Sequence, residues 1–206
     1  MSMLEKIKNT CDRLSASFDS IDPMRKEILE KIANYIQNRV DENKYINLIY
    51  VCTHNSRRSH FGQIWSAVAA EYYKIPNVHT FSGGVELTAF NPSAIRALES
   101  LGFRIEKLND KANPLYHVYY QEKKPVECFS KEVQDIANPQ SDFAAIMTCS
   151  EAEQNCPFIP NASLRLSTTY EDPKLYDGTT QEHEQYVERS LLIGLESLYV
   201  YSLINK

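Results

Sequence analysis

Ile46-Asn-Leu-Ile-Tyr-Val51 runs directly into Cys52-Thr-His-Asn-Ser-Arg-Arg58-Ser59, and this stretch decides the fold. A short apolar run of this kind predicts a buried strand. A polar loop follows it, and a helix is expected to begin near Ser59. In such a unit the loop amides and the positive end of the helix converge on one point, which suits the binding of an anion.

Cys52 and Arg58 bracket this loop with two groups that suit oxyanion chemistry. Surrounding amides and a nearby cation favour the thiolate form of a cysteine, which is the nucleophilic form. The guanidinium of Arg58 is a planar fork that matches two oxygens of a tetrahedral oxyanion. The same spacing also arises by chance, and a cysteine that ends a buried strand often only packs. Other segments must decide between the two interpretations.

Composition and charge exclude several classes of protein. The 206 residues are 43% hydrophobic and 24% charged, which allows an ordinary buried core. The net charge of −5 argues against nucleic acid or an anionic membrane as the main partner. We see no apolar stretch long enough to span a bilayer and expect no signal peptide. The five cysteines have no disulfide-framework spacing, so we predict a cytoplasmic protein.

From residue 45 to residue 206, apolar runs alternate with helical patterns. This alternation predicts an α/β domain with a doubly wound, four-stranded parallel sheet and flanking helices. In such sheets, ligands bind at the carboxyl ends of the strands. Gly194 lies inside the last helix, where we expect a neighbour to pack closely. The predicted strands are 46–51, 78–82, 143–148 and 164–166, and the predicted helices are 59–73, 91–102 and 181–205.

Two segments stand outside this alternation. Residues 1–44 carry two apolar stripes at helical spacing, which predict an N-terminal helical hairpin whose second helix is capped by Asp22-Pro23. Residues 113–135 predict a β-hairpin insertion, with strands at 115–120 and 126–129. Its tyrosines either pack or line a substrate groove; they are Tyr116, Tyr119 and Tyr120. Cys11 and Cys128 lie within apolar patterns and are expected to pack.

Cys149 and Cys156 lie seven residues apart, in Cys149-Ser-Glu-Ala-Glu-Gln-Asn-Cys156-Pro157. If this segment is helical, two turns separate the cysteines by about 10 Å, too far for a disulfide. Pro157 breaks helices, so unwinding near it is easy. The alternatives are two incidental cysteines on a surface helix, or a zinc site, for which the spacing is not that of a structural motif. We expect no metal and no bound cofactor.

Asp172-Pro173 lies in the loop before the last helix. A carboxyl group near an oxyanion site can donate a proton to a leaving oxygen. Asp-Pro pairs are also common in ordinary turns, and the adjacent Glu171 is an alternative acid.

These three segments together resemble the low-molecular-weight protein tyrosine phosphatase superfamily, and most closely its thioredoxin-coupled arsenate reductases. The resemblance implies that Cys52 is the nucleophile, that Arg58 binds the oxyanion and that Asp172 is the acid. It also implies that Ser59 steadies the thiolate and that Asn55 holds the shape of the loop. The residues expected around the oxyanion are Thr53, His54, Asn55, Ser56, Arg57, Arg58 and Ser59.

The pair formed by Cys149 and Cys156 resembles a feature of the reductase branch specifically. It implies a relay from Cys52 to Cys149 to Cys156, with arsenate as substrate and a thioredoxin-type protein as reductant. Two alternatives remain open. One is a phosphatase that hydrolyses a phosphomonoester, on a phosphoprotein or a small molecule, through a Cys52 phosphocysteine. The other is a phosphoprotein-binding or redox-sensing module without catalysis.

The sequence departs from the family pattern at three positions. His54 stands where glycine is usual, and we expect its β-carbon to strain or tilt the loop. Arg57 stands where many members carry a second cysteine, and we expect it to add positive charge beside the anion site. Lys174 follows Asp-Pro where phosphatases that act on tyrosine often have an aromatic residue, so stacking on a phenyl ring is not expected there.

Overall fold

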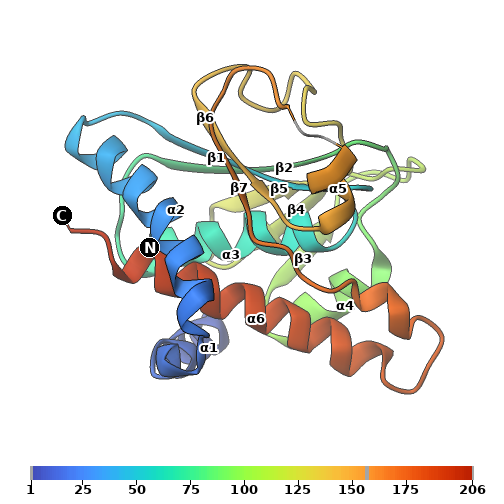
Figure 1. Ribbon diagram of the computed structural model, residues 1–206. Helices are drawn as coiled ribbons and strands as arrows, with labels where there is room; N and C mark the ends of the chain where they lie inside the picture. Colours follow the sequence, from blue (N-terminus) through green and yellow to red (C-terminus); the bar gives the residue numbers. More distant parts are fainter. Residues whose placement is uncertain (1, 156–157, 206) are drawn as a thin grey trace.

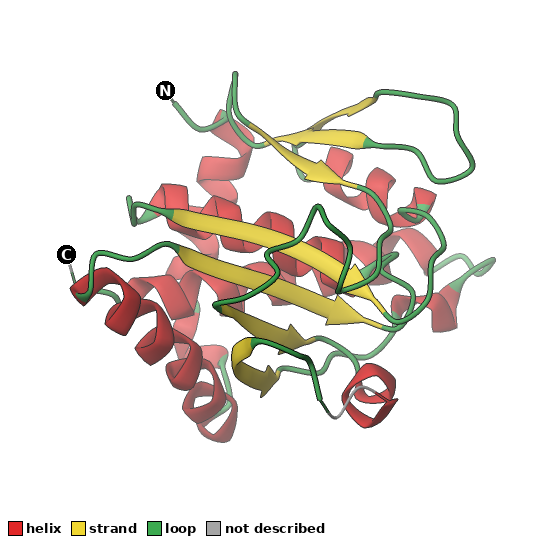
Figure 2. Ribbon diagram, turned by 90° about the horizontal axis from the view of Figure 1, so that it is seen from above, coloured by secondary structure: helices red, strands yellow, loops and turns green. Residues whose placement is uncertain are grey.

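The computed structural model describes residues 2–155 and 158–205. Its centre is the strand β1 (Ile46–Cys52), which pairs in parallel with β2 (Val78–Gly84) on one side and β6 (Phe143–Met147) on the other. β7 (Ala162–Ser167) extends the sheet beyond β6, so the strand order is β2-β1-β6-β7. Figure 2 shows the four arrows running the same way. The predicted four-stranded parallel sheet is therefore confirmed.

Helices cover this sheet (Figure 1). Two of them, α3 (Arg58–Tyr72) and α6 (Glu182–Ser202), pack against each other across one face. Their contact is close at Gly194, where an added β-carbon would meet the Trp65 ring at 2.8 Å, so the predicted close packing is confirmed. The shorter elements are α4 (Pro92–Ser100), α5 (Ser150–Asn155) and the 3-10 helix η2 (Pro173–Tyr176).

The N-terminal segment forms α1 (Glu5–Ser15), the 3-10 helix η1 (Phe18–Ser20) and α2 (Pro23–Asp41). The side chain of Asp22 accepts hydrogen bonds from the amides of Met24 and Arg25, as the capping prediction requires. Both long helices pack against α6, and α2 also contacts β1 and β7. Their buried residues, among them Ile7 and Ile36, share one hydrophobic cluster with Leu48 of β1. The extension is thus built into the main core.

The hairpin expected within 113–135 forms as β4 (Tyr116–Tyr119) and β5 (Pro125–Cys128), paired antiparallel. A third strand, β3 (Arg104–Lys107), was not predicted and pairs with β4. The insertion is therefore part of a separate three-stranded sheet in the order β3-β4-β5. Cys128 is fully buried in β5, as is Cys11 in α1, so both cysteines pack as expected.

The two faces of the parallel sheet are covered differently. The α3 and α6 face carries the large cluster, which includes Trp65, Tyr186 and Tyr201. The other face carries a smaller cluster that holds both Cys52 and Cys149, together with Val133 and Ala152. The small cluster thus covers this face and reaches the carboxyl ends of β1 and β6. Within the described chain, the helices include none that is both long and apolar enough to cross a membrane.

Candidate active site

The loop from Cys52 to Ser59, called the cradle below, joins the end of β1 to the start of α3. Its turn falls on Asn55, whose φ of 44° is in the left-handed region. Asparagine tolerates this region better than most residues. The amide group of Asn55 donates to Ser59 Oγ at 2.8 Å and accepts from the backbone N–H of Lys131 at 2.9 Å. Asn55 therefore holds the cradle from both sides, in agreement with its predicted role.

Ser59 Oγ lies 3.1 Å from Cys52 Sγ. Because Asn55 already donates to this hydroxyl oxygen, the hydroxyl proton of Ser59 is available to Cys52. The geometry therefore allows Ser59 to donate a hydrogen bond to the sulfur of Cys52. Cys52 itself is 4% exposed, at the bottom of the cradle.

The guanidinium of Arg58 is buried, and two of its nitrogens already donate hydrogen bonds within the protein. Nη1 donates to the carbonyl oxygen of Tyr170 at 2.7 Å, and Nη2 donates to Asp172 Oδ2 at 2.6 Å. Its Nε is buried and has no hydrogen-bond partner in the described part of the chain. A buried donor without an acceptor is unfavourable, so this edge of the fork is suited to an incoming anion.

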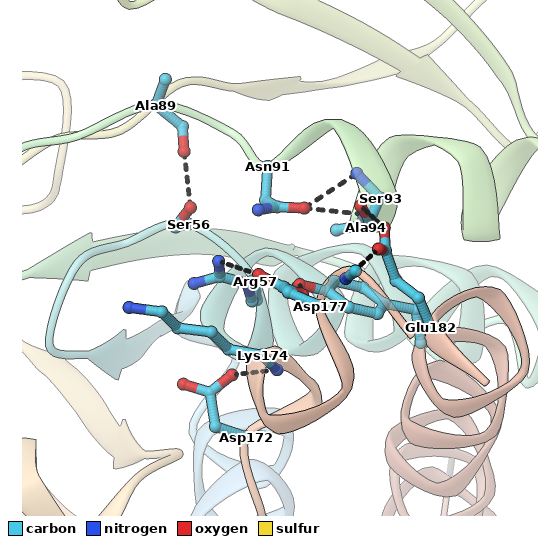
Figure 3. A network of polar contacts seen from close by, with 12 residues as sticks. Ser56, Arg57, Ala89, Asn91, Ser93, Ala94, Asp172, Lys174, Asp177 and Glu182 are labelled. Atoms are coloured by element: carbon cyan, nitrogen blue, oxygen red, sulfur yellow. Dashed lines mark hydrogen bonds and ion pairs between the residues drawn. The ribbon is translucent and has the colours of Figure 1, made fainter. Parts of the chain in front are cut away.

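Asp172 belongs to the loop that joins β7 to α6; residues 168–177 are called the acid loop below. Its Oδ1 accepts from the amide of Lys174 at 3.0 Å, which caps η2, as Figure 3 shows. Its Oδ2 forms the ion pair with Arg58. An oxyanion that engages Arg58 competes with this carboxylate. Glu171, the alternative acid, is 81% exposed and pairs instead with Arg189, so the geometry favours Asp172.

Four predicted oxyanion-binding residues turn their side chains to other partners. Arg57 Nε donates to Tyr186 Oη at 2.7 Å, and its Nη2 lies 3.4 Å from Asp177. His54 pairs with Glu86 at 3.1 Å, and Ser56 donates to the carbonyl oxygen of Ala89 at 2.7 Å. Thr53 is the fourth, and its Oγ1 contacts Cys149 and Glu151. These residues can contribute backbone groups to an anion site, while Arg58 contributes its side chain.

Two expectations about the departures from the family pattern need correction. The positive charge of Arg57 does not stand free beside the cradle, because Asp177 balances it. The strain expected at His54 is also absent, because among the described residues the left-handed backbone of this loop falls on Asn55 and not on His54. Glycine is instead needed on the neighbouring strand. A β-carbon on Gly84 would lie 2.8 Å from the Asn55 nitrogen and the Thr53 carbonyl oxygen.

Cys149 follows β6 and is fully buried. Its Sγ lies 3.4 Å from Thr53 Oγ1 and accepts from the amide of Ala152 at 3.4 Å. Since Thr53 directly follows Cys52, Cys149 lies against the wall of the cradle. The segment after it is helical over Ser150–Asn155, so the helical alternative considered for this segment is the one observed. Cys156 and Pro157 lie outside the described residues.

Several residues that shape the site were not predicted. Lys131 frames the cradle through its backbone, since its carbonyl oxygen accepts from the amide of Gly84 at 2.8 Å. His60, in the first turn of α3 after the cradle, is fully buried, and its ring packs against that of Phe90 with 4.2 Å between the ring centroids. Burial, with the charge of Lys131, lowers the pKa of His60 to about 3. These residues are distant in sequence or lack a motif, so no local signal marks them.

The chain is similar to known proteins in sequence and in fold. No family model matches the chain. An arsenate reductase of Shouchella clausii is 25% identical over 142 residues, which is 69% of this chain and 84% of that protein. An arsenate reductase of Bacillus subtilis is 26% identical over 153 residues, 72% of this chain and 87% of that protein. The chain is therefore similar in sequence to arsenate reductases over more than two thirds of its length.

A solved structure described as an arsenate reductase in the phosphate-binding state has the same fold. It superposes with a TM-score of 0.51 at 16% identity and covers 78% of this chain and 99% of that one. At this identity the likeness bears on the fold, and it agrees with the predicted parallel α/β architecture.

Proposed function

We propose that this protein is an arsenate reductase that works through the thiolate of Cys52. Arsenate binds at the cradle, where Arg58 Nε is a buried donor without an acceptor in the described chain. Cys52 Sγ attacks arsenic, and one arsenate oxygen leaves as water with a proton from Asp172. A thioarsenate adduct on Cys52 results. Similarity to curated arsenate reductases over more than two thirds of the chain supports this assignment.

The observation that carries the reductase assignment is the place of Cys149. A phosphatase needs one cysteine, and water completes its reaction. Here a second cysteine lies against the cradle wall, with its Sγ 3.4 Å from Thr53 Oγ1. A second cysteine beside the adduct supplies the sulfur nucleophile that an attack on Cys52 needs.

The proposed relay then balances as follows. Cys149 Sγ bonds to Cys52 Sγ while the bond between Cys52 and arsenic breaks. The electron pair of that bond stays on arsenic, so arsenate is reduced to arsenite and the two sulfurs become a disulfide. Cys156 next attacks Cys149, and Cys52 leaves as a thiolate. A thioredoxin-type dithiol protein reduces the remaining Cys149–Cys156 bridge.

Single-turnover arsenite release tests the relay. The pre-reduced protein is mixed with arsenate, without any reductant, and arsenite is measured. Cys149→Ser is expected to release no arsenite, whereas Cys128→Ala releases it like the wild type. Cys128 is a suitable control because burial raises the pKa of its thiol to about 12, which keeps it unreactive. Arsenite release by Cys149→Ser at the wild-type rate would contradict the reductase assignment.

Phosphomonoester hydrolysis is the second candidate, and one observation favours it. Cys149 is fully buried, and its sulfur accepts a hydrogen bond from the first turn of α5, as a packing residue can. Attack by water on a Cys52 phosphocysteine would use the same cradle, Arg58 and Asp172. Steady hydrolysis of an aryl phosphate by the wild type and by Cys149→Ser alike, with no arsenite released by the wild type, would support the phosphatase.

A further inference from the structure

We propose that Arg25, on the N-terminal helix α2, is a positioning residue for the anion-binding fork of Arg58. The inference rests on the oxyanion chemistry proposed above and gives the N-terminal extension a part in it. Figure 1 shows α2 and α6 on the same side of the parallel sheet, and the two helices pack together. Arg25 acts through two intermediates, Glu196 of α6 and Tyr170 of the acid loop.

The first link joins the extension to α6. Arg25 Nε donates to Glu196 Oε1 and Nη2 donates to Oε2, both at 2.8 Å. This is the bidentate arrangement that fixes both partners in orientation as well as in position. The side chain of Glu196 is 5% exposed and that of Arg25 is 19% exposed, so water screens the pair little.

The second link joins α6 to the acid loop. Tyr170 donates its hydroxyl to Glu196 Oε2 at 2.6 Å, and its ring lies under the Arg25 guanidinium at 4.8 Å. The pKa of Tyr170 is raised well above its usual value by burial and by the charge of Glu196, so it stays a donor. Arg25 and Glu196 therefore hold both the ring and the hydroxyl of Tyr170.

The third link reaches the site. The backbone of Tyr170 donates its N–H to the carbonyl oxygen of Thr148 at 3.1 Å and accepts from Arg58 Nη1 at 2.7 Å. The place of the Tyr170 carbonyl thus decides the angle at which Arg58 presents its free Nε to an anion. Without Arg25, Glu196 becomes a buried carboxylate that has lost its cation, which is unfavourable and displaces its side chain. Tyr170 would then shift with it.

The same helix supplies a matched control. Arg39, near the other end of α2, forms a two-point ion pair with Asp142 at 2.9 and 2.6 Å, and its side chain is 10% exposed. Asp142 directly precedes β6, at the amino ends of the parallel strands, whereas the cradle lies at their carboxyl ends. Arg39→Met therefore removes a comparable arginine from the same helix without touching the acid loop.

The experiment compares Arg25→Met with Arg39→Met in the full chain. The first readout is the phosphate concentration that protects Cys52 from alkylation by iodoacetamide. Phosphate is a tetrahedral oxyanion that the relay cannot reduce, so this readout reports anion binding without turnover. The second is kcat/KM for arsenate reduction, and the third is the thermal midpoint. We expect Arg25→Met to weaken protection and kcat/KM by about tenfold, because displacement of a binding group by a fraction of an ångström has this order of effect. Arg39→Met should keep protection and kcat/KM within about twofold of wild type, because no group of the anion site depends on Arg39.

Tyr170→Phe removes only the hydroxyl link and keeps the ring, so it serves if Arg25→Met does not fold. It should weaken protection in the same direction by a smaller factor. Equal losses in Arg25→Met and Arg39→Met, or no loss in Arg25→Met and Tyr170→Phe, would overturn the inference. Phosphate that protects Cys52 in a wild-type protein that never reduces arsenate would instead contradict the proposed function, and the comparison of Arg25→Met with Arg39→Met would still be valid.

Discussion

The acid loop and α5 both adjoin the cradle, yet the protein holds them in different ways. The acid loop is tied to two helices by three contacts: Arg58 of α3 binds Asp172, Glu196 of α6 binds Tyr170, and Tyr186 of α6 binds Asp177 at 2.7 Å. α5 is a short helix held by the burial of Ala152, by one hydrogen bond from Arg165 of β7 to the carbonyl oxygen of Glu153 at 2.7 Å, and by longer contacts such as Thr53 to Glu151 at 3.3 Å.

This difference matches the two stages of the proposed reaction. Attack on an oxyanion requires donors and an acid in fixed positions, because preorganised groups stabilise charge without rearranging. Passing a disulfide from Cys149 onward requires a segment that can unwind, since a helix of this length keeps its ends apart. Rigid geometry on one side of the cradle and a short helix on the other would serve both needs.

Arg58→Lys is the strongest test of the rigid side. Lysine keeps the charge but cannot reach Tyr170, Asp172 and an anion at once, because it lacks the planar fork. We expect kcat/KM for arsenate to fall by roughly 10²–10³-fold, the size seen when a preorganised donor to the reacting oxyanion is lost. Steady-state kinetics measures this, with the circular dichroism spectrum as a check on folding. Near-wild-type kcat/KM would show that the fork is not used.

Acid pH should also lower the free energy of unfolding, through His60, which is buried next to the cradle. Burial lowers its pKa to about 3 in the folded protein, against about 6.5 when unfolded. Between these values only the unfolded state takes up the proton, so stability falls as pH decreases through this window. At pH 5 the loss would be about 2 kcal/mol, from 1.4 kcal/mol for each pH unit below 6.5.

Urea unfolding at pH 8 and pH 5 measures this loss. His60→Asn, which cannot titrate, is expected to have a lower stability at pH 8 but a shallower dependence on pH. Parallel pH profiles for the two proteins would mean that another group governs acid unfolding.

The smallest effects should separate the two regions directly. Arg57→Met frees Asp177 at the end of the acid loop, and we expect kcat/KM to fall by about tenfold because the acid is less well positioned. Glu151→Ala removes an exposed contact of α5 and should change stability by less than about 0.5 kcal/mol, with kcat/KM unchanged. Kinetics and urea midpoints check both variants. A larger loss of activity in Glu151→Ala than in Arg57→Met would reverse the comparison.

Much of the candidate site was predictable because its parts are local in sequence. The apolar run 46–51 and the loop after it fix a strand, a turn and a helix, whatever surrounds them. Asp22, Asn91 and Asp172 each cap the element that follows, since a side-chain oxygen reaches amides two or three residues on. Cys11 and Cys128 were correctly predicted to pack, because each falls within an apolar pattern.

Other features could not be predicted because their partners lie far apart in the chain. β3 is short and half-exposed, and only its pairing with β4 makes it a strand. Arg57 looked like a free charge because Asp177 is 120 residues away. The sequence by itself determined the chemistry of the cradle, since it depends on residues within one loop. Only the tertiary structure decided where Arg57, Arg25 and Cys149 lie, because long-range packing alone sets the distances between separate elements.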